Sequence, residues 1–576
     1  MCGIFSLLNI EKNTNSPFSH EFINKQFMKG KGRGPEHSAI HYSGSKAIFG
    51  FHRLAINGLN TNSNQPIEHE NIMLICNGEI YNYKELYKEL EIEPKTDSDC
   101  EVIIHLYKRF GIEHTLQLLD GVFAFILLDY NINDEMAKIF VCRDPFGVRP
   151  LYLLHPTKST QYYGFASELK CLSGFKELLN GYNIKQMKPG TYSRFELSFK
   201  VSSEWKLMEL EAIYHIPSII TTQYMNFNYQ QELEFWTPII QKQLLQAVDK
   251  RCVTTQRPIA CLLSGGLDSS LITALVNDFH IYNDLPILET YSIGLVGSED
   301  LKYAKIVADY LGTKHTEIVL TEADFLNAIP EVIEKIESYD TTSVRASIGN
   351  YLLGKYISKH SEAKVIFNGD GSDELTGGYL YFHKAPNSLE FDLECRRLLK
   401  DIHLYDVLRS DKCISTHGLE PRTPFLDREF VQTYLSIPAE IRFHGGHGEP
   451  EKHLLRSAFA KYEGANFKNL LPDEIIWRTK EAFSDGVSKT TRSLFEIIKE
   501  HVSKTFISKG KVYEHLKPQT LEQEYYREIF EDKYKGLGEI VPYFWMPRFI
   551  EGVTDASART LDIYKKINGE KNNIDT

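Results

Sequence analysis

The sequence lacks the marks of secreted, membrane-bound and nucleic-acid-binding proteins. It has no basic segment followed by an apolar one at its start, as a secretory signal requires, and no run of about 18 apolar residues that could span a membrane. The nine cysteines are scattered and form no C-x-x-C pair, which favours reduced thiols in the cytoplasm over disulfides or zinc sites. The net charge of −12 offers no basic excess. We therefore expect a cytoplasmic protein without nucleic-acid or membrane partners, and leave a homodimer open.

The chain carries enough apolar material for more than one domain. Its 576 residues are 42% hydrophobic and 25% charged, which is ordinary for a globular protein. In the first part, short apolar runs at 47–51, 72–76 and 122–128 alternate with turns, so we predict a β-rich sandwich. Helical patterns occur at 84–90 and 100–110.

The second half alternates strand and helix patterns. Strands are predicted at 259–263, 290–293 and 364–367, with helices beginning near Ser269 and Asp300. Such alternation predicts a parallel sheet covered by helices, and the C-terminal part is mainly helical. We therefore predict an α/β protein of two domains. Its segments are a first domain at 2–195, a linker at 196–232, a second domain at 233–560 and a frayed tail at 561–576.

Cys2 is a candidate nucleophile. Removal of Met1 would place a thiol and a free α-amine on one residue, and an amine with a pKa of about 8 can act as the base for the thiol. A thiol that attacks a carboxamide also needs an oxyanion hole, an anchor for the substrate carboxylate and an anchor for its amine. The candidates are Asn77 and Gly78 for the hole, Arg53 for the carboxylate, and Glu79 and Asp99 for the amine. Each of these is more often a turn residue or a surface charge when it stands alone.

A serine- and glycine-rich segment follows the predicted strand at 259–263. Glycines let the backbone approach an anion, and the helix that follows offers free N–H groups at its N-terminus. Asp268 can hold Mg²⁺ on a pyrophosphate. The segment is not a Walker P-loop, because G-x-x-x-x-G-K-[ST] is absent. Its candidate anion-binding residues are Ser264, Gly265, Gly266, Asp268, Ser269 and Ser270.

A second glycine loop, Asn368–Leu375, follows the predicted strand at 364–367. Its acidic residues suit Mg²⁺ coordination and proton transfer, with Asp373 as a further metal ligand. Lys480 could neutralise charge on phosphates as an adenylate forms.

Five blocks in the first 152 residues resemble the glutaminase domain of class II, N-terminal-nucleophile glutamine amidotransferases. They are Cys2–Ile4, Arg53–Leu54, Asn77–Asn82, Ser98–Glu101 and Arg143–Tyr152. The resemblance implies a four-layer α/β/β/α fold and hydrolysis of glutamine to glutamate and ammonia by Cys2. It also implies that glutamine is bound by Arg53, Leu54, Ala55, Ile56, Asn57, Asn77, Gly78, Glu79 and Asp99. Glu36 stands where this family usually has aspartate.

The Ser264–Ser270 loop resembles the pyrophosphate loop of N-type ATP pyrophosphatases, which implies a Rossmann-like fold. From Cys2 to about Ile550, the whole chain is similar to the glutamine-hydrolysing asparagine synthetases. That resemblance implies that aspartate and ATP form β-aspartyl-AMP and pyrophosphate, and that ammonia carried inside the protein attacks the adenylate. It places Leu263, Ile293, Asn368 and Gly369 at the ATP site.

Asp370 departs from this family, which has glutamate there, a residue tied to adenylate formation and ammonia attack. The aspartate is shorter by roughly 1.3–1.5 Å, a displacement of a size that can cost ~10²-fold in rate. Asn368 also replaces the usual serine. Two alternatives therefore stay open, namely amidation of a different acceptor acid and a weakened or regulatory homologue.

Overall fold

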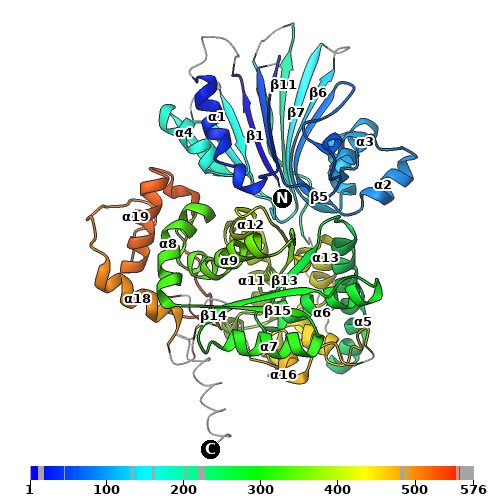
Figure 1. Ribbon diagram of the computed structural model, residues 1–576, viewed down its shortest axis with the longest axis vertical. Coiled ribbons are helices and arrows are strands. Elements are labelled where there is room, and N and C mark those ends of the chain that lie inside the picture. The colour runs from blue at the N-terminus through cyan, green and yellow to red at the C-terminus, as the bar shows by residue number, and fades with distance from the viewer. Residues whose placement is uncertain are drawn as a thin grey trace, which may run out of the picture. The chain divides into compact units, whose positions relative to one another are not determined.

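The computed structural model describes most of the chain in two compact units (Figure 1). The described residues are 2–10, 18–44, 46–131, 135–157, 162–200, 204–217, 227–466, 468–479, 486–488, 492–552, 555 and 557. The first unit comprises Met1–Pro217, Thr254–Arg257 and Ser415–Glu420, and the second comprises Ser218–Val253, Pro258–Ile414 and Pro421–Thr576.

The first unit contains two six-stranded sheets. One sheet has the order β10 (Tyr182–Gln186), β8 (Tyr152–Pro156), β9 (Tyr163–Ala166), β1 (Gly3–Leu8), β3 (Ala47–Arg53) and β2 (His37–Ser43). The other has the order β12 (Lys206–Ile213), β11 (Thr191–Ser198), β7 (Met136–Arg143), β6 (Gly121–Asn131), β5 (Ile72–Ile80) and β4 (Ile67–His69). Helices α1 (His20–Met28) and α4 (Lys170–Leu178) contact the first sheet, and α2 (Tyr83–Leu90) and α3 (Val102–Leu118) pack on the second.

Side-chain alternation along β5 and β6 separates the two cores of this unit. Leu74 and Phe125 belong to the core shared with α2 and α3, whereas Ile75 and Ile126 belong to the core between the sheets. Successive residues of a strand point to opposite faces, so a strand that is apolar throughout can be buried on both sides. The predicted α/β/β/α sandwich is confirmed.

The predicted linker at 196–232 differs from the structure, because it contains the edge strand β12 and the start of α5 (Tyr229–Val253). Met208, Leu210 and Ile213 on this strand are 50%, 49% and 68% exposed. An edge strand with apolar residues on its open face gives no clean alternation of buried and polar positions. The sequence pattern was therefore misleading at this place.

The second unit is built on a five-stranded sheet. Its order is β15 (Lys314–Leu320), β14 (Glu289–Leu295), β13 (Ile259–Leu262), β16 (Val365–Phe367) and β17 (Glu420–Arg422). Strand β13 runs parallel to β14 and to β16, and β14 runs parallel to β15. The predicted parallel sheet is thus confirmed, although β15 and β17 were not predicted.

Helices make up most of the rest of this unit, and α6, α7 and α9 pack on β13 and β14. The helices not yet bounded are α6 (Leu267–Tyr282), α7 (Glu299–Leu311), α8 (Glu322–Ile336), α9 (Thr341–His360), α10 (Ser372–Thr376), α11 (Ser388–Asp401), α12 (Asp406–Ser415), α13 (Arg428–Ser436), α14 (Ala439–Arg442), α15 (His453–Phe459), α16 (Asp473–Ile476), α18 (Leu494–Thr505) and α19 (Leu521–Lys533). Because β13 and β16 are parallel neighbours, the loops that follow them leave the same edge of the sheet.

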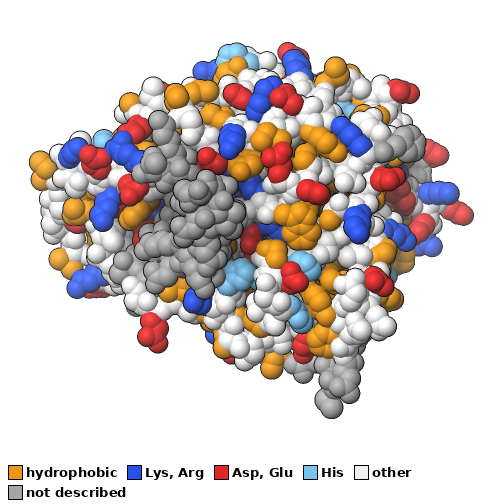
Figure 2. Space-filling model, turned by 90° about the horizontal axis from the view of Figure 1, so that it is seen from below, with side chains coloured by type: hydrophobic (Ala, Val, Ile, Leu, Met, Phe, Trp, Pro, Cys, Tyr) orange, Lys and Arg blue, Asp and Glu red, His pale blue; other side chains and the backbone are white. Residues whose placement is uncertain are grey.

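Acidic and basic side chains are interspersed on the face drawn in Figure 2, and the described residues there form no continuous basic area. In the described part of the chain, no helix is both long enough and apolar enough to cross a membrane.

Candidate active sites

Cys2 lies immediately before β1, where strand β5 and the segment after β3 reach it. Its backbone N donates to Asn77 Oδ1 at 3.1 Å, and its Sγ lies 3.7 Å from the Leu54 carbonyl oxygen. Asn77 Nδ2 donates to Ser167 Oγ at 3.4 Å. Two of the predicted glutaminase blocks are thus in direct contact with the candidate nucleophile.

Burial raises the pKa of the Cys2 thiol to about 11, although the residue as a whole is partly exposed. The hydrogen bond to the Leu54 carbonyl oxygen acts in the opposite direction. A thiol with a raised pKa is a poor nucleophile until a base removes its proton. The arrangement therefore requires a base close to Cys2.

Gly78 follows Asn77 on β5, opposite Phe123 of β6. A Cβ at this position would stand 2.6 Å from the Val122 carbonyl oxygen and 2.7 Å from Phe123 Cβ. Only glycine fits so close to the neighbouring strand. This packing fixes the backbone at the predicted oxyanion hole.

Arg53 is buried and holds the loop that follows β3. Its Nη1 donates to the Asn60 carbonyl oxygen at 2.8 Å and to Asn64 Oδ1 at 2.7 Å. Its Nη2 donates to the carbonyl oxygens of Asn57 and Gly58. A substrate carboxylate would have to share or replace some of these bonds.

Glu36, the departure from the usual aspartate, also supports this segment. Its Oε2 accepts from the Ala55 backbone N at 2.6 Å, and its Oε1 accepts from Arg257 Nη2 at 2.7 Å. The Ile56 carbonyl accepts from the Gln256 backbone N at 3.0 Å. Glu36 thus acts on the shape of the loop.

Glu79 and Asp99 are both 4% exposed. Asn57 Nδ2 donates to Glu79 Oε2 at 2.7 Å, and the Ile80 backbone N donates to Asp99 Oδ2 at 2.7 Å. Buried carboxylates held this way have fixed positions, as an ammonium anchor needs.

The loop after β13 has the form of an anion-binding turn. Ser264 Oγ and Ser269 Oγ are 2.9 Å apart, and Gly266 precedes the first residue of α6. Gly265 has φ = +72°, and a Cβ there would overlap the backbone of Tyr303 and Ala304. A glycine is therefore required at this turn.

A cavity of about 180 Å³ opens beside this loop. Its lining includes apolar groups from β13, β14 and α9, together with five carboxylates and four cations. The charged lining residues are Asp268, Asp300, Asp370, Asp373, Asp406, Arg409, Lys452, Arg456 and Arg478.

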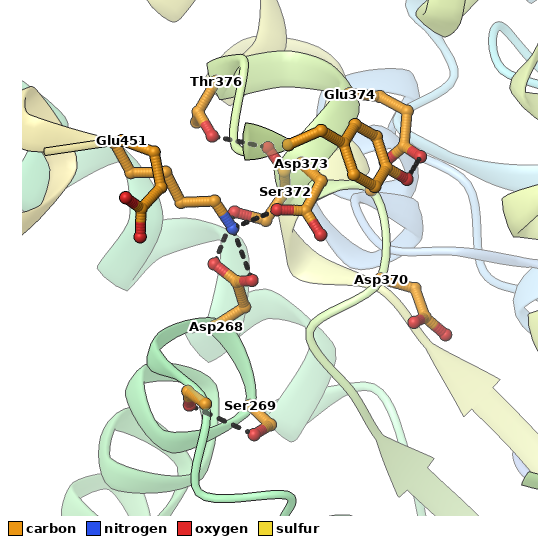
Figure 3. Close-up of polar contacts among 12 residues, drawn as sticks. Asp268, Ser269, Asp370, Ser372, Asp373, Glu374, Thr376 and Glu451 are labelled. Atoms are coloured by element: carbon orange, nitrogen blue, oxygen red, sulfur yellow. Dashed lines mark hydrogen bonds and ion pairs between the residues drawn. The ribbon is translucent and has the colours of Figure 1, made fainter. Parts of the chain in front are cut away.

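Asp268 and Asp373 converge on one point of the cavity, where Lys452 Nζ lies 2.5 Å from an oxygen of each (Figure 3). Two carboxylate oxygens directed at one small cation are a donor set that fits Mg²⁺. The described residues hold no group of three or more metal-ligating side chains, so ligands from elsewhere, such as phosphates, would have to complete a metal shell.

Asp370 points away from this pair in Figure 3. It contacts Arg409 instead. Its Oδ1 lies 3.2 Å from Arg409 Nη2, which also pairs closely with Asp406, and its buried Oδ2 has no hydrogen-bond partner among the described residues. Burial raises the pKa of Asp406 to about 6, Arg409 lowers it, and the charges of Asp370 and Asp373 raise it further. This corner of the cavity therefore holds a carboxyl group whose pKa is raised above its ordinary value.

Comparison with known proteins covers both units. An asparagine synthase family model matches residues 240–397 and 385–539, and a glutamine amidotransferase domain model matches residues 1–204. Proteins named asparagine synthetase [glutamine-hydrolyzing] from Gallus gallus, Cricetulus griseus and Homo sapiens are 40%, 40% and 39% identical, over 98% of this chain and 99% of theirs. The chain belongs to the glutamine-hydrolysing asparagine synthetase family. A solved NMN synthetase from Francisella tularensis, at 11% identity over 56% of this chain and 100% of that one, has a TM-score of 0.20, too low to bear on fold or function.

Seen within this family, the predicted nucleotide residues divide into two groups. Leu263, Ser264, Gly266, Asp268, Ser269, Ile293, Asn368, Gly369, Asp370 and Asp373 line the cavity. Gly265 shapes the turn without lining the cavity, and Ser270 is fully buried on α6. Lys480 lies outside the described residues.

Sequence reasoning missed Lys452, Arg409 and Asp406 in the cavity and Ser167 beside Asn77. Arg409 and Asp406 stand three residues apart on α12, a spacing that ordinary surface ion pairs share. Lys452 follows Glu451 in a polar loop just after the glycine-rich segment 444–448, with no strand immediately before it. No local signal distinguished these residues from solvated charges.

Proposed function

We propose that this chain uses glutamine, aspartate and ATP to make asparagine, glutamate, AMP and pyrophosphate. One observation carries the proposal, namely that a member of this family keeps Cys2 in contact with Asn77 and also keeps an acidic cavity beside a glycine turn. The first arrangement suits release of ammonia, and the second suits formation of an adenylate.

In the first unit, the α-amine of Cys2 would remove the thiol proton, and the sulfur would attack the glutamine carboxamide. Asn77 and the Gly78 N–H would stabilise the oxyanion, while Arg53, Glu79 and Asp99 would hold the amino-acid end. Residues 54–57 would line the glutamine site. Breaking the C–N bond releases ammonia and leaves a thioester, which water hydrolyses to glutamate.

In the second unit, the Ser264–Ser269 turn would bind the phosphates, and Leu263, Ile293, Asn368 and Gly369 would contact the nucleotide. The aspartate β-carboxylate attacks the α-phosphate, pyrophosphate leaves, and ammonia then displaces AMP from the acyl carbon. Asp370 would accept the proton that the nitrogen loses, and Lys480 would neutralise phosphate charge. Asp268 and Asp373 would hold Mg²⁺, which supplies further neutralisation of the phosphates when bound.

We also propose the domain boundaries and the cellular location of the protein. Residues 2–195 would form the glutaminase and 233–560 the synthetase. None of the nine cysteines forms a disulfide, which fits a reducing cytoplasm. We infer no nucleic-acid or membrane partner, and a homodimer is the assembly to test first.

The test is a mass balance on the full-length protein supplied with glutamine, ATP, Mg²⁺ and aspartate. Glutamate, pyrophosphate and asparagine should appear together, and pyrophosphate should depend on aspartate. The Cys2→Ala variant should lose glutamine-dependent synthesis but keep synthesis from ammonium salts. Glutamate production without aspartate-dependent pyrophosphate would exclude asparagine synthesis as the activity.

A further inference from the structure

Lys452 is a buried cation between the two carboxylates that are the proposed metal ligands. Its side chain is 1% exposed, and its Nζ lies 2.5 Å from Asp268 Oδ2 and 2.5 Å from Asp373 Oδ1. Burying an ammonium is costly unless anions neutralise it, and burying carboxylates is costly unless a cation neutralises them. The Lys452 ammonium and the two carboxylates therefore stabilise one another.

The other cations that line the cavity have different partners. These pairs are Arg409 with Asp370 and Asp406, Arg478 with Asp300, and Arg456 with Glu451. Lys452 is thus the described lining cation that pairs with both Asp268 and Asp373.

The chain around Lys452 is shaped to keep it there. The residue has φ = 61° and ψ = 22°, a left-handed backbone conformation that residues other than glycine rarely adopt. Arg456 fixes the backbone at this position. Its backbone N donates to the Lys452 carbonyl at 2.9 Å, and its Nε donates to the Glu451 carbonyl at 2.7 Å. A side chain at Gly378 would overlap Lys452 Cε, so that glycine leaves room for the lysine.

We propose that Lys452 is a resident counter-ion that a divalent cation must displace, so that the metal enters together with nucleotide. A divalent cation bound to the same two oxygens would lie close to the Lys452 ammonium, and repulsion between the two cations opposes joint occupancy. Free metal alone would have to evict Lys452 without compensation. ATP changes the balance, because its phosphates add ligands to the metal and accept the released ammonium. The inference rests on the proposed function, which takes Asp268 and Asp373 as the metal ligands.

The test measures Mn²⁺ binding to the full-length protein by electron paramagnetic resonance, with and without a non-hydrolysable ATP analogue. Wild type should bind Mn²⁺ weakly alone and tightly with the analogue. Lys452→Met should bind Mn²⁺ at least tenfold more tightly than wild type without nucleotide, whereas Lys452→Arg should remain weak. Lys412→Met is the matched control, since Lys412 is equally buried against Glu337 and does not line the cavity.

Two results separate the inference from the proposed function. If Lys452→Met binds Mn²⁺ no more tightly than wild type, while Asp268→Asn and Asp373→Asn weaken binding with the analogue, the exchange is wrong and the metal site stands. If the two asparagine variants bind Mn²⁺ like wild type with the analogue, the proposed metal site fails and the exchange fails with it.

A measurement on wild type covers the case in which Lys452→Met does not fold. Acetic anhydride labelling, read by peptide mass spectrometry, should modify Lys452 several-fold more when saturating Mn²⁺ is present, with Lys412 as the internal reference. Equal labelling of Lys452 with and without Mn²⁺ would overturn the displacement.

Discussion

Replacement of Asp370 tests whether the short carboxylate limits the synthetase reaction. Asp370 Oδ1 stands 3.2 Å from Arg409 Nη2, and the Gly371 backbone N donates to Asp406 Oδ2 at 3.2 Å. An ion pair and a hydrogen bond thus join the loop 368–371 to helix α12. The aspartate therefore already reaches its cationic neighbour. We expect this contact to compensate for the missing methylene, which argues against a regulatory homologue without activity.

Asp370→Asn keeps the size of the side chain and removes its charge. A hydrogen bond to a charged partner contributes about 1.5–3 kcal/mol. If that interaction is made in the transition state, its loss slows asparagine formation by about 10- to 150-fold, at about 1.36 kcal/mol per tenfold, and the loss of the proposed proton acceptor slows it further. Asp370→Glu would carry the carboxylate roughly 1.3 Å farther, past the position of its contact with Arg409. We therefore expect Asp370→Glu to be no faster than wild type.

The assay is the initial rate of aspartate-dependent pyrophosphate and asparagine formation, with glutamate measured in the same samples. Asp309→Asn is the control, because Asp309 is 62% exposed in an i,i+4 pair with Lys305 and should leave every rate unchanged. An Asp370→Asn rate within threefold of wild type, or an Asp370→Glu rate several-fold above it, would refute the reasoning.

Three further predictions follow from contacts in the two units. Asn77→Asp should lower glutamate production about 10²- to 10³-fold, as expected for a lost oxyanion donor, while ammonium-dependent synthesis continues; equal losses in both assays would contradict the role. Gly265 has φ = +72°, so Gly265→Ala should destabilise the second unit by more than about 1 kcal/mol in thermal unfolding. The same variant should lose pyrophosphate formation and retain glutaminase activity. Burial lowers the pKa of His52 to about 4. Between pH 6.5 and pH 5 the unfolded chain therefore takes up a proton at His52 that the folded chain does not. The free energy of unfolding should fall by roughly 2 kcal/mol over this range. His52→Gln should reduce that loss in urea titrations at the two pH values, and an equal loss would show that His52 does not cause it.

The central strands could be predicted from sequence because they are buried on both sides. Runs such as 122–128 and 259–263 are apolar at every position, and such runs have few alternatives to a central strand. Edge strands differ, since one side of the backbone and part of the side chains face solvent. The strand β15 begins Lys314-His-Thr-Glu and is mostly exposed or half-buried there, so its sequence resembles a loop.

The candidate sites could be predicted to the extent that their residues lie in one stretch of chain. Ser264–Ser269 and Asn368–Asp373 each follow a central strand, so chain order alone places both loops at the carboxyl edge of the sheet. Arg409 and Lys452 come from a helix and a loop farther along the chain. Their approach to Asp370 and Asp268 depends on tertiary packing, which short-range patterns do not encode.

The pairing of Lys452 with Asp268 and Asp373 also follows from a general electrostatic requirement. Two carboxylates directed at one point repel each other at all times, including the time before a metal arrives, and a buried site cannot rely on water to screen them. A protein that folds without its metal therefore needs an internal cation at that point, or else must bind protons there. Aspartates in glycine loops thus predict a cation site without predicting which cation occupies it at rest. In this chain the resting cation is a lysine more than 70 residues from either aspartate, held in a strained conformation that only the folded protein can impose.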